Sequence, residues 1–358
     1  MMALNFIFWV LAVPNWTEVL KPQASLLLEY QEIYEKQRDS SSLMMGAKLG
    51  IFPEWNQNWN AGIELKLGEN SPQAIPDRLI LTAGPSNRPI SLNQAYVAHR
   101  FSKNGVFSLG KFLMPFSSSP LTWDHDLTPE GAYESFLITL SSQSSLKFHA
   151  GQFFLGSGIE NLAENRKNHR SWAFTEALTW SYASAERFRL ELNLQVWNFL
   201  NIPEALKTEA LRRGAEYVLK DEAFFLKDSK FMPLETSFEI SSLPLGILTS
   251  LRTAFAINIL DENKDFGLFG EVRVGRSWVK KNFMGILSFY YNQAMTTLSH
   301  FTERDFAYSN RLAGRFELHY YFNESVRLNT SYLLARRAQE SLYQDHRHEW
   351  RFGVEFKL

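Results

Sequence analysis

The chain has 358 residues, with no cysteine and no long apolar run. Without cysteine there can be no disulfide bond, no thiolate metal site and no thiol catalysis. The longest apolar run, Phe6 to Pro14, is far shorter than the roughly 18 residues that a membrane-spanning helix needs. With 37 basic and 38 acidic residues, the chain also lacks the positive charge typical of nucleic-acid-binding proteins. These absences exclude a helical membrane protein and argue against a nucleic-acid partner.

Aromatic residues, by contrast, are abundant. They make up 15% of the chain, with 29 Phe, 13 Tyr and 10 Trp, although the mean hydropathy is only -0.24. Bulky apolar residues must therefore be interleaved with polar ones, which also excludes a disordered chain. The length fits either two soluble domains or one large β architecture, and this composition favours the second.

The dominant pattern is an alternation of apolar and polar residues. From Arg187 to Trp197, apolar side chains occupy every second position, which predicts a β-strand with one apolar face. The same pattern recurs at 43–51, 59–67, 146–152, 234–240, 247–259, 311–322, 326–334 and 350–358. Lys, Arg, Glu or Asn occupy the strand centres on the polar faces. Alternation alone does not tell whether water lies outside the sheet or inside it.

The connections between the predicted strands alternate between short and long. About sixteen strands connected in this way indicate an all-β fold, a transmembrane antiparallel β-barrel with short periplasmic turns and long extracellular loops. We predict one barrel domain over residues 24–358, closed by the strands Leu26 to Tyr34 and Trp350 to Leu358.

Two tryptophans of one predicted strand fit the aromatic girdles of a membrane barrel. Trp172 and Trp180 share a face and are separated by roughly the height of the apolar band, about 25 Å. The alternative is a pair of core tryptophans in a soluble sheet. Glu176 falls between them on the same face, so either this strand lies at a subunit interface or the register slips there.

The N-terminus carries a short apolar stretch at residues 4–13. The small residues around Ala12 offer a cleavage site, so we predict a secretory signal within residues 1–23. No Lys or Arg precedes the stretch. Either the true start lies upstream, or the stretch is a hydrophobic first turn.

The most distinctive sequence motifs lie in residues 92–131, which contain LNQAYVAHRF, SLGKFLMPF and LTWDHDLTPEG. It resembles the family of outer-membrane porins distantly related to the phosphate-selective porins, in which QAYVxYRF, G-K/R-F-x-x-P-F and W-D-x-D-L-x-P-E-G follow one another. The resemblance implies a barrel of about sixteen strands that passes small solutes through the outer membrane of a Gram-negative bacterium. Such barrels usually end in an aromatic residue that the barrel-assembly machinery recognises, whereas this chain ends in Leu358.

If the polar faces line a lumen, its wall is rich in arginine. We expect this wall to include Arg187, Arg189, Arg252, Arg273, Arg311, Arg315 and Arg327. The excess of bases over inward glutamates predicts a weak preference for anions.

The third long connection, residues 114–134, is the predicted constriction. Folded into the lumen, it would set acids opposite the basic wall. The predicted constriction residues are Asp124, Asp126, Glu130, Glu134, Lys111 and Arg100. Alternatively, the loop acids are simply solvated or cap a short helix, or Asp124, Asp126 and Glu130 hold a hard cation.

The connection over residues 200–232 differs from its neighbours. Pro203, followed by Leu206, Ala210 and Leu211, predicts a short external helix. It could serve as a lid, a receptor surface or packing over the barrel mouth.

We predict a porin for passive diffusion of small hydrophilic solutes and ions, in contact with outer-membrane lipid and able to form a homotrimer. The sequence lacks a Gly-x-Ser-x-Gly, an HExxH and a phosphate loop, so we expect neither an enzyme nor a cofactor. His125 and His346 lie in loops dense with ordinary charged residues. Two alternatives remain: a structural or adhesive barrel with an occluded lumen, and a soluble all-β binding protein.

Overall fold

The computed structural model describes most of the chain. The described residues are 21–35, 38–54, 56–67, 79–80, 90–116, 119–124, 127–157, 170–184, 188–202, 207, 210–211, 213, 215–220, 223–226, 230–242, 247, 249–275, 282–298, 302, 306–339 and 345–357. The predicted N-terminal signal at residues 4–13 lies outside them. None of the described helical segments is long and apolar enough to cross a membrane.

The described residues form nineteen strands. The first ten are β1 (Pro22–Glu35), β2 (Arg38–Ile51), β3 (Trp59–Leu67), β4 (Leu79–Ile80), β5 (Ile90–His99), β6 (Gly105–Lys111), β7 (Glu130–Thr139), β8 (Ser144–Ser157), β9 (Arg170–Ser184) and β10 (Phe188–Leu200). The others are β11 (Tyr217–Lys220), β12 (Ala223–Leu226), β13 (Pro233–Ser242), β14 (Thr249–Asn258), β15 (Phe266–Gly275), β16 (Asn282–Asn292), β17 (Arg311–Tyr321), β18 (Val326–Arg337) and β19 (Arg347–Lys357).

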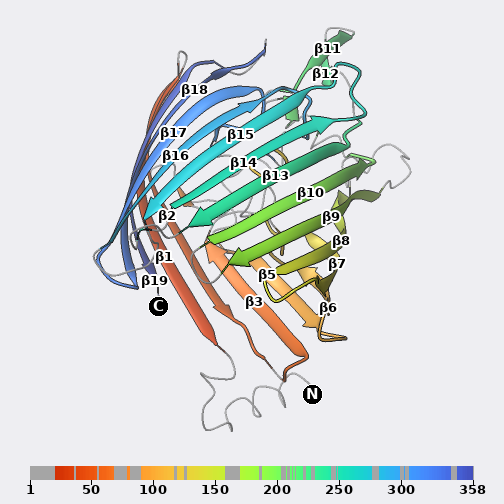
Figure 1. The fold of residues 1–358 in the computed structure, drawn as a ribbon. Coiled ribbons are helices and arrows are strands. Elements are labelled where there is room, and N and C mark those ends of the chain that lie inside the picture. The colour runs from red at the N-terminus through yellow and green to blue at the C-terminus, as the bar shows by residue number, and fades with distance from the viewer. Residues whose placement is uncertain are drawn as a thin grey trace, which may run out of the picture.

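Sixteen of these strands form one closed antiparallel barrel (Figure 1). The two-residue β4 pairs with β2 beyond the part that pairs with β3, while β11 and β12 make a separate hairpin. β1 closes the barrel against β19, with Leu26 opposite Phe356 and Tyr34 opposite His348. The predicted barrel and its closing strands are confirmed. Closure leaves no strand edge unpaired, which a sheet in hydrocarbon requires.

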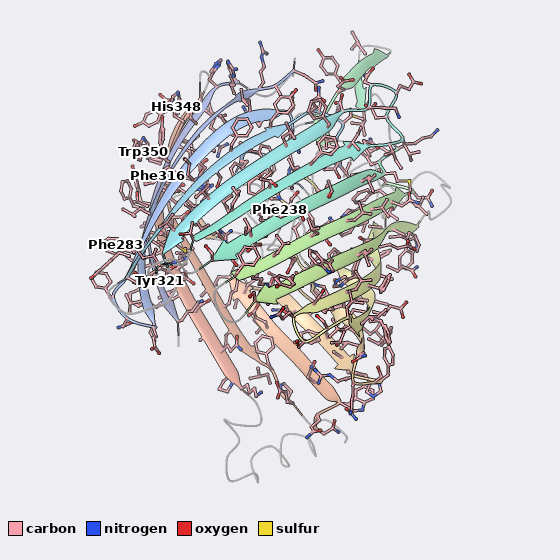
Figure 2. The ribbon with its side chains drawn as sticks, viewed as in Figure 1. Phe238, Phe283, Phe316, Tyr321, His348 and Trp350 are labelled. Atoms are coloured by element: carbon pink, nitrogen blue, oxygen red, sulfur yellow. The ribbon has the colours of Figure 1, made fainter. Side chains whose placement is uncertain are left out.

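The alternation in the sequence becomes two different faces of the barrel wall. In β10, Leu192 and Leu194 are 43% and 49% exposed, whereas Asn193 and Gln195, which alternate with them, are buried on the inner side. Phe283, Phe316 and Trp350 project from the outer face of other strands (Figure 2). An apolar outer face with a polar interior is typical of a barrel in a membrane rather than in water.

The two ends of the barrel differ. One end carries both strand termini, Pro22 and Lys357, together with short turns such as 100–104, 140–143 and 322–325. The other end carries most of the long connections, among them 112–129, 201–232 and 293–310, and the β11–β12 hairpin (Figure 1).

The segment 200–232 contains more strand than the sequence analysis expected. Helical backbone is described only at Lys207, Ala210 and Leu211, and the hairpin β11–β12 follows over 217–226. Tyr217, Val218 and the Phe-rich β12 have the β-branched and aromatic side chains that favour strands. The prediction of a helix left this hairpin out.

Candidate functional site

The connection between β6 and β7 packs against the inner wall of the barrel. Phe116 lies against Tyr133, His149 and Trp197, with ring centroids 5.2 to 6.2 Å apart. Trp123 stacks on Trp197 of β10 at 4.6 Å, with the two ring planes 2° apart. All these side chains belong to inner positions, so Phe116 and Trp123 lie inside the barrel.

Glycines flank this connection where strands approach closely. At Gly110, φ is +126° and a Cβ would lie 2.2 Å from the carbonyl oxygen of Ala95. At Gly131, a Cβ would lie 2.0 Å from the carbonyl oxygen of Gln152. Only glycine fits both positions without a shift of the backbone. The sequence motifs Gly-Lys-Phe, with Gly110, and Pro-Glu-Gly, with Gly131, thus mark the points where the chain leaves and rejoins the wall.

A buried carboxylate of β13 holds the polar side of the same loop. Glu235 is fully buried and accepts hydrogen bonds from the Ser119 backbone N–H at 2.9 Å and the Ser119 hydroxyl at 2.8 Å. The Thr122 hydroxyl donates a third, and Gln195 Nε2 donates to Thr122 Oγ1 at 3.3 Å. We call residues 119–124 the inner loop.

The middle of the inner loop is seated on β15 and β16. Asn292 Nδ2 donates to the carbonyl oxygen of Leu121 at 3.2 Å. A Cβ on Gly267 would lie 2.8 Å from Leu121 Cδ2, so the glycine leaves the space that the leucine fills. Leu121 belongs to a buried apolar cluster with Phe269 and Tyr290.

A cavity of about 440 Å³ lies between the inner loop and the remaining wall. Pro120 and Trp123 line it on the loop side. Five arginines from β14, β15, β17, β18 and β19 line it on the wall side, together with His319 and three glutamates. These charged residues are Arg252, Arg273, Arg315, Arg327, Arg351, Glu29, Glu271 and Glu317.

Most of the wall arginines have a carboxylate two residues away on the same face. Arg273 Nε lies 2.5 Å from Glu271, Arg315 lies 3.3 Å from Glu317, and Arg351 pairs with Glu349. Two further pairs are Arg189 with Glu191 at 2.8 Å and Arg327 with Glu355 on the neighbouring strand. A carboxylate beside a guanidinium reduces the field that a passing ion meets.

The predicted lumen-wall arginines therefore lie on the inner face, as far as the structure describes them. Arg189, Arg252, Arg273, Arg315 and Arg327 do so along their strands. Arg311 is also on the inner face, at the long-loop end, where its Nε donates to the carbonyl oxygen of Ala307 at 3.3 Å. Arg187 lies outside the described residues.

Three predicted constriction residues do not face the lumen, which corrects that part of the prediction. Glu130 and Glu134 belong to β7 and alternate with the buried Tyr133 and Ser135, so they point outward with Phe136. Lys111 pairs with Glu130 in register on the same outer face, with Nζ 3.8 Å from the carboxylate. The strand begins at Glu130, which assigns both glutamates to the outer face of the wall.

Arg100 is also misplaced in the prediction. It follows the last residue of β5 at the short-turn end, and its backbone N–H donates to the carbonyl oxygen of Asn58 at 2.7 Å. The connection that contains the inner loop leaves the wall at the other end of the barrel, after Lys111. Arg100 therefore belongs to the short-turn end and not to the loop.

Of the two aspartates predicted at the constriction, the structure describes Asp124 but not Asp126. Asp124 is buried in the inner loop, and its carbonyl oxygen accepts a hydrogen bond from the Leu127 N–H at 3.2 Å. Asp126 lies outside the described residues. Among the residues that are described, no three His, Asp or Glu side chains could hold a metal ion together.

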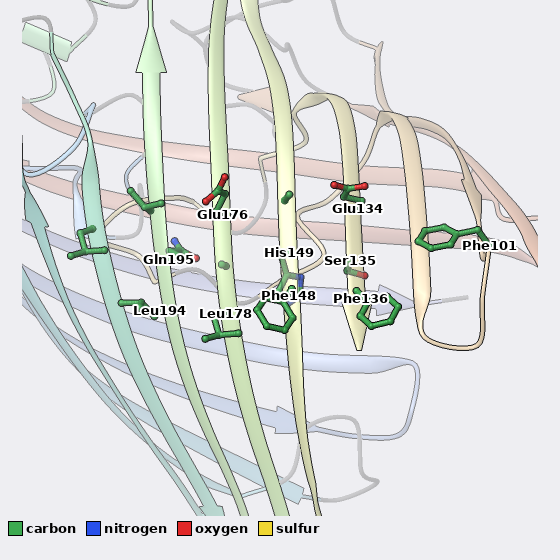
Figure 3. Close-up of a pocket in the computed structure, with 14 residues that line it drawn as sticks. Phe101, Glu134, Ser135, Phe136, Phe148, His149, Glu176, Leu178, Leu194 and Gln195 are labelled. Carbon is green, nitrogen blue, oxygen red and sulfur yellow. The ribbon is translucent and has the colours of Figure 1, made fainter. Parts of the chain in front are cut away.

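Glu176 lies on the outer face of β9, between Trp172 and Trp180, in the register that the sequence predicts. Ala150 of β8 pairs in register with Glu176 on one side and with Glu134 of β7 on the other, so the two glutamates are separated by a single strand. Both carboxylates line an apolar hollow on this wall (Figure 3). The volume of this hollow is about 570 Å³. Phe136, Phe148, Leu178 and Leu194 are among the side chains that line it (Figure 3).

Buried polar contacts also join two connections at the long-loop end of the barrel. Asp265 accepts a hydrogen bond from the Met295 N–H at 2.9 Å, and its own N–H donates to Asp261 Oδ2 at 2.9 Å. Burial raises the pKa of the Asp265 carboxyl. These contacts tie the 259–265 connection to the 293–310 connection.

The residues that seat the inner loop carry no distinctive signal in the sequence. Trp197 and Glu235 appear in the sequence as ordinary inward positions of two strands. Glu29, Glu35 and Glu349 also face inward, and Arg347 pairs with Glu35 and Glu349. The available signal was the strand register, which places these carboxylates on the same face as the counted arginines.

Comparison with known proteins agrees with this geometry. A closed sixteen-stranded barrel with a loop packed inside it defines an outer-membrane porin. The family model described as "Putative porin" matches residues 12–321, and the chain belongs to this family. It is accordingly a protein of the outer membrane of Gram-negative bacteria. No protein with a curated description matches the chain.

Several solved barrels share its fold. OmpF of Salmonella typhi is 10% identical with a TM-score of 0.59, and the alignment covers 95% of this chain and 97% of OmpF. OprB of Pseudomonas putida is 9% identical with a TM-score of 0.60, covering 96% and 95%. A trimer form of OmpT of Vibrio cholerae is 8% identical with a TM-score of 0.52, covering 94% and 99%. At these identities the likeness concerns the fold alone.

Proposed function

We propose that this porin passes small hydrophilic solutes and ions by diffusion, through the space between the inner loop and the arginine-bearing wall. The observation that carries the proposal is the cavity of about 440 Å³ lined by Pro120 and Trp123 on one side and by charged strand residues on the other. Charged and polar linings favour hydrated solutes over apolar ones.

Conductance tests the proposal. The purified barrel, added to a planar bilayer in 1 M KCl (roughly 3 Å Debye length), is expected to give discrete ohmic current steps. The control is the same protein denatured by heat before addition. A folded, inserted barrel that carries no current would instead support a structural barrel with an occluded lumen.

We further propose that the pore prefers anions only weakly. Inward bases exceed inward carboxylates, but the arginines of the cavity lie beside glutamates such as Glu271, Glu317 and Glu349. The paired charges leave a small net field, so selectivity should depend strongly on ionic strength.

We also propose that the protein forms a homotrimer in which the outer wall of β7 to β9 faces a neighbouring subunit. Glu134 and Glu176 lie near the centres of their strands. The other charged side chains described on the outer face of the wall lie within three residues of a strand end. A carboxylate costs free energy in hydrocarbon, and lipid headgroups do not reach this depth, whereas a protein neighbour can supply hydrogen-bond donors.

Native mass spectrometry in detergent tests this assignment. The double variant Glu134→Leu, Glu176→Leu should shift the population from trimer to monomer, because the partner's donors lose their acceptors. Thr253→Leu, an outward polar position on β14, is the control and should keep the wild-type distribution. An unchanged trimer in the double variant, or a wild type that is monomeric, would contradict the proposal.

A further inference from the structure

We propose that Glu235 is the positioning residue that holds the inner loop inside the lumen and thereby sets the width of the passage. This inference rests on the proposed function, because it assigns a residue to the control of diffusion. Glu235 itself does not line the cavity, so its effect on a solute would be exerted through the loop.

The hydrogen bonds of Glu235 reach two residues of the loop. Its two oxygens accept from the backbone N–H and the hydroxyl of Ser119 and from the hydroxyl of Thr122. Ser119 and Thr122 are both completely buried. Three hydrogen bonds therefore join one side chain of β13 to two residues of the loop. Glu235 is thus a polar attachment between the wall and the loop.

The other contacts of the loop differ in kind. Asn292 and Gln195 donate neutral hydrogen bonds, and Leu121 and Trp123 pack on apolar surface. Apolar packing is largely non-directional, so it favours burial of the loop without fixing one register on the wall. The carboxylate, with acceptor positions at fixed places on β13, specifies where Ser119 and Thr122 lie.

The consequence for the passage follows from the two sides of the loop. Ser119 and Thr122 face Glu235, while Pro120 and Trp123 line the cavity opposite the arginines. Without Glu235, the loop would hold Pro120 and Trp123 less firmly, although Trp123 would still stack on Trp197. The distance between the loop and the opposite wall would then vary, and the passage would widen on average.

Three variants separate this role from a general effect of charge. Glu235→Ala removes every acceptor. Glu235→Gln keeps one carbonyl oxygen and adds an amide donor, to which the hydroxyls of Ser119 and Thr122 can adapt. The matched control is Glu239→Ala. Glu239 is another inward-facing glutamate of β13, four residues further along the strand and opposite Arg252 in register. Folding of each variant is checked by the heat-dependent shift of its gel mobility.

The first measurement is single-channel conductance, together with the swelling rate of liposomes in neutral sugars of increasing size. Glu235→Ala is expected to raise the conductance roughly twofold and to admit larger sugars, because the loop no longer narrows the lumen. Glu235→Gln should stay close to wild type, and Glu239→Ala should keep the wild-type size limit. A folded Glu235→Ala with unchanged conductance and size limit would overturn the inference.

The second measurement does not require conduction, so it stays informative if the proposed function fails. The natural chain has no cysteine, so spin labels can be placed uniquely at Pro120→Cys and Ser331→Cys, which line the same cavity. The distance distribution between the labels should be narrow with Glu235 and clearly broader with Glu235→Ala. Equal widths in the two proteins would show that Glu235 does not position the loop.

Discussion

Leu287→Arg is expected to lower the free energy of unfolding in lipid by about 2 to 4 kcal/mol, the cost of an arginine at the midplane of a bilayer. Leu287 is the central residue of β16 and is 62% exposed on the outer face. Val272 and Phe316 flank it in register on the neighbouring strands. The new guanidinium would therefore lie in hydrocarbon without a nearby polar partner.

The matched control is Phe283→Arg on the same strand and the same face. Phe283 is 57% exposed but lies next to the short-turn end, where an arginine costs about 0 to 1 kcal/mol because it reaches the interface. Reversible unfolding in guanidinium, with the protein in phospholipid vesicles, measures both variants. Equal losses at the two positions would show that β16 does not cross the hydrocarbon core.

The barrel could be predicted from the sequence because its determinants are local and repeated. Each strand shows its apolar face at every second residue, and each short turn shows where the next strand begins. The pairing of β1 with β19 could be predicted as well. In a membrane the first and last strands cannot leave an edge unpaired, and each is the other's only free neighbour. Even the unexpected position of Glu176, between two outward tryptophans, was correct in register.

The inner loop could not be predicted to the same depth, because its contacts are distant in sequence. Ser119 and Glu235 are 116 residues apart, and Asn292 is 171 residues from Leu121. No periodicity links such residues. The error at Glu134 was local instead: the alternation of Ala132, Glu134 and Phe136 extends β7 back to Glu130, so a glutamate expected in the loop belongs to the outer wall.

We expect the charges of the strands to affect selectivity more than Asp124 and Glu130 do. Glu130 faces outward and Asp124 is buried, so neutralising these two acids is expected to change little that a passing ion meets. The arginines of the cavity remain as the main source of positive potential in the passage. Their removal should have the larger effect.

The triple variant Arg252→Gln, Arg273→Gln, Arg327→Gln is expected to reverse the weak anion preference. Its loss of three positive charges leaves Glu271 and Glu355 without the arginines that pair with them. In a gradient between 0.1 M and 0.01 M KCl, where the Debye length rises to about 30 Å at the dilute side, the reversal potential should change sign.

A control with the same change in net charge distinguishes the cavity from the protein as a whole. Arg189→Gln, Arg336→Gln and Arg337→Gln together also remove three positive charges, but these arginines lie near strand ends and do not line the cavity. This control should keep the sign of the wild-type potential, because these arginines lie near the ends of the barrel, where surrounding solvent weakens their field more than in a narrow passage. If both triple variants moved the potential equally, the ions would follow a path other than the space between the inner loop and the arginine-bearing wall.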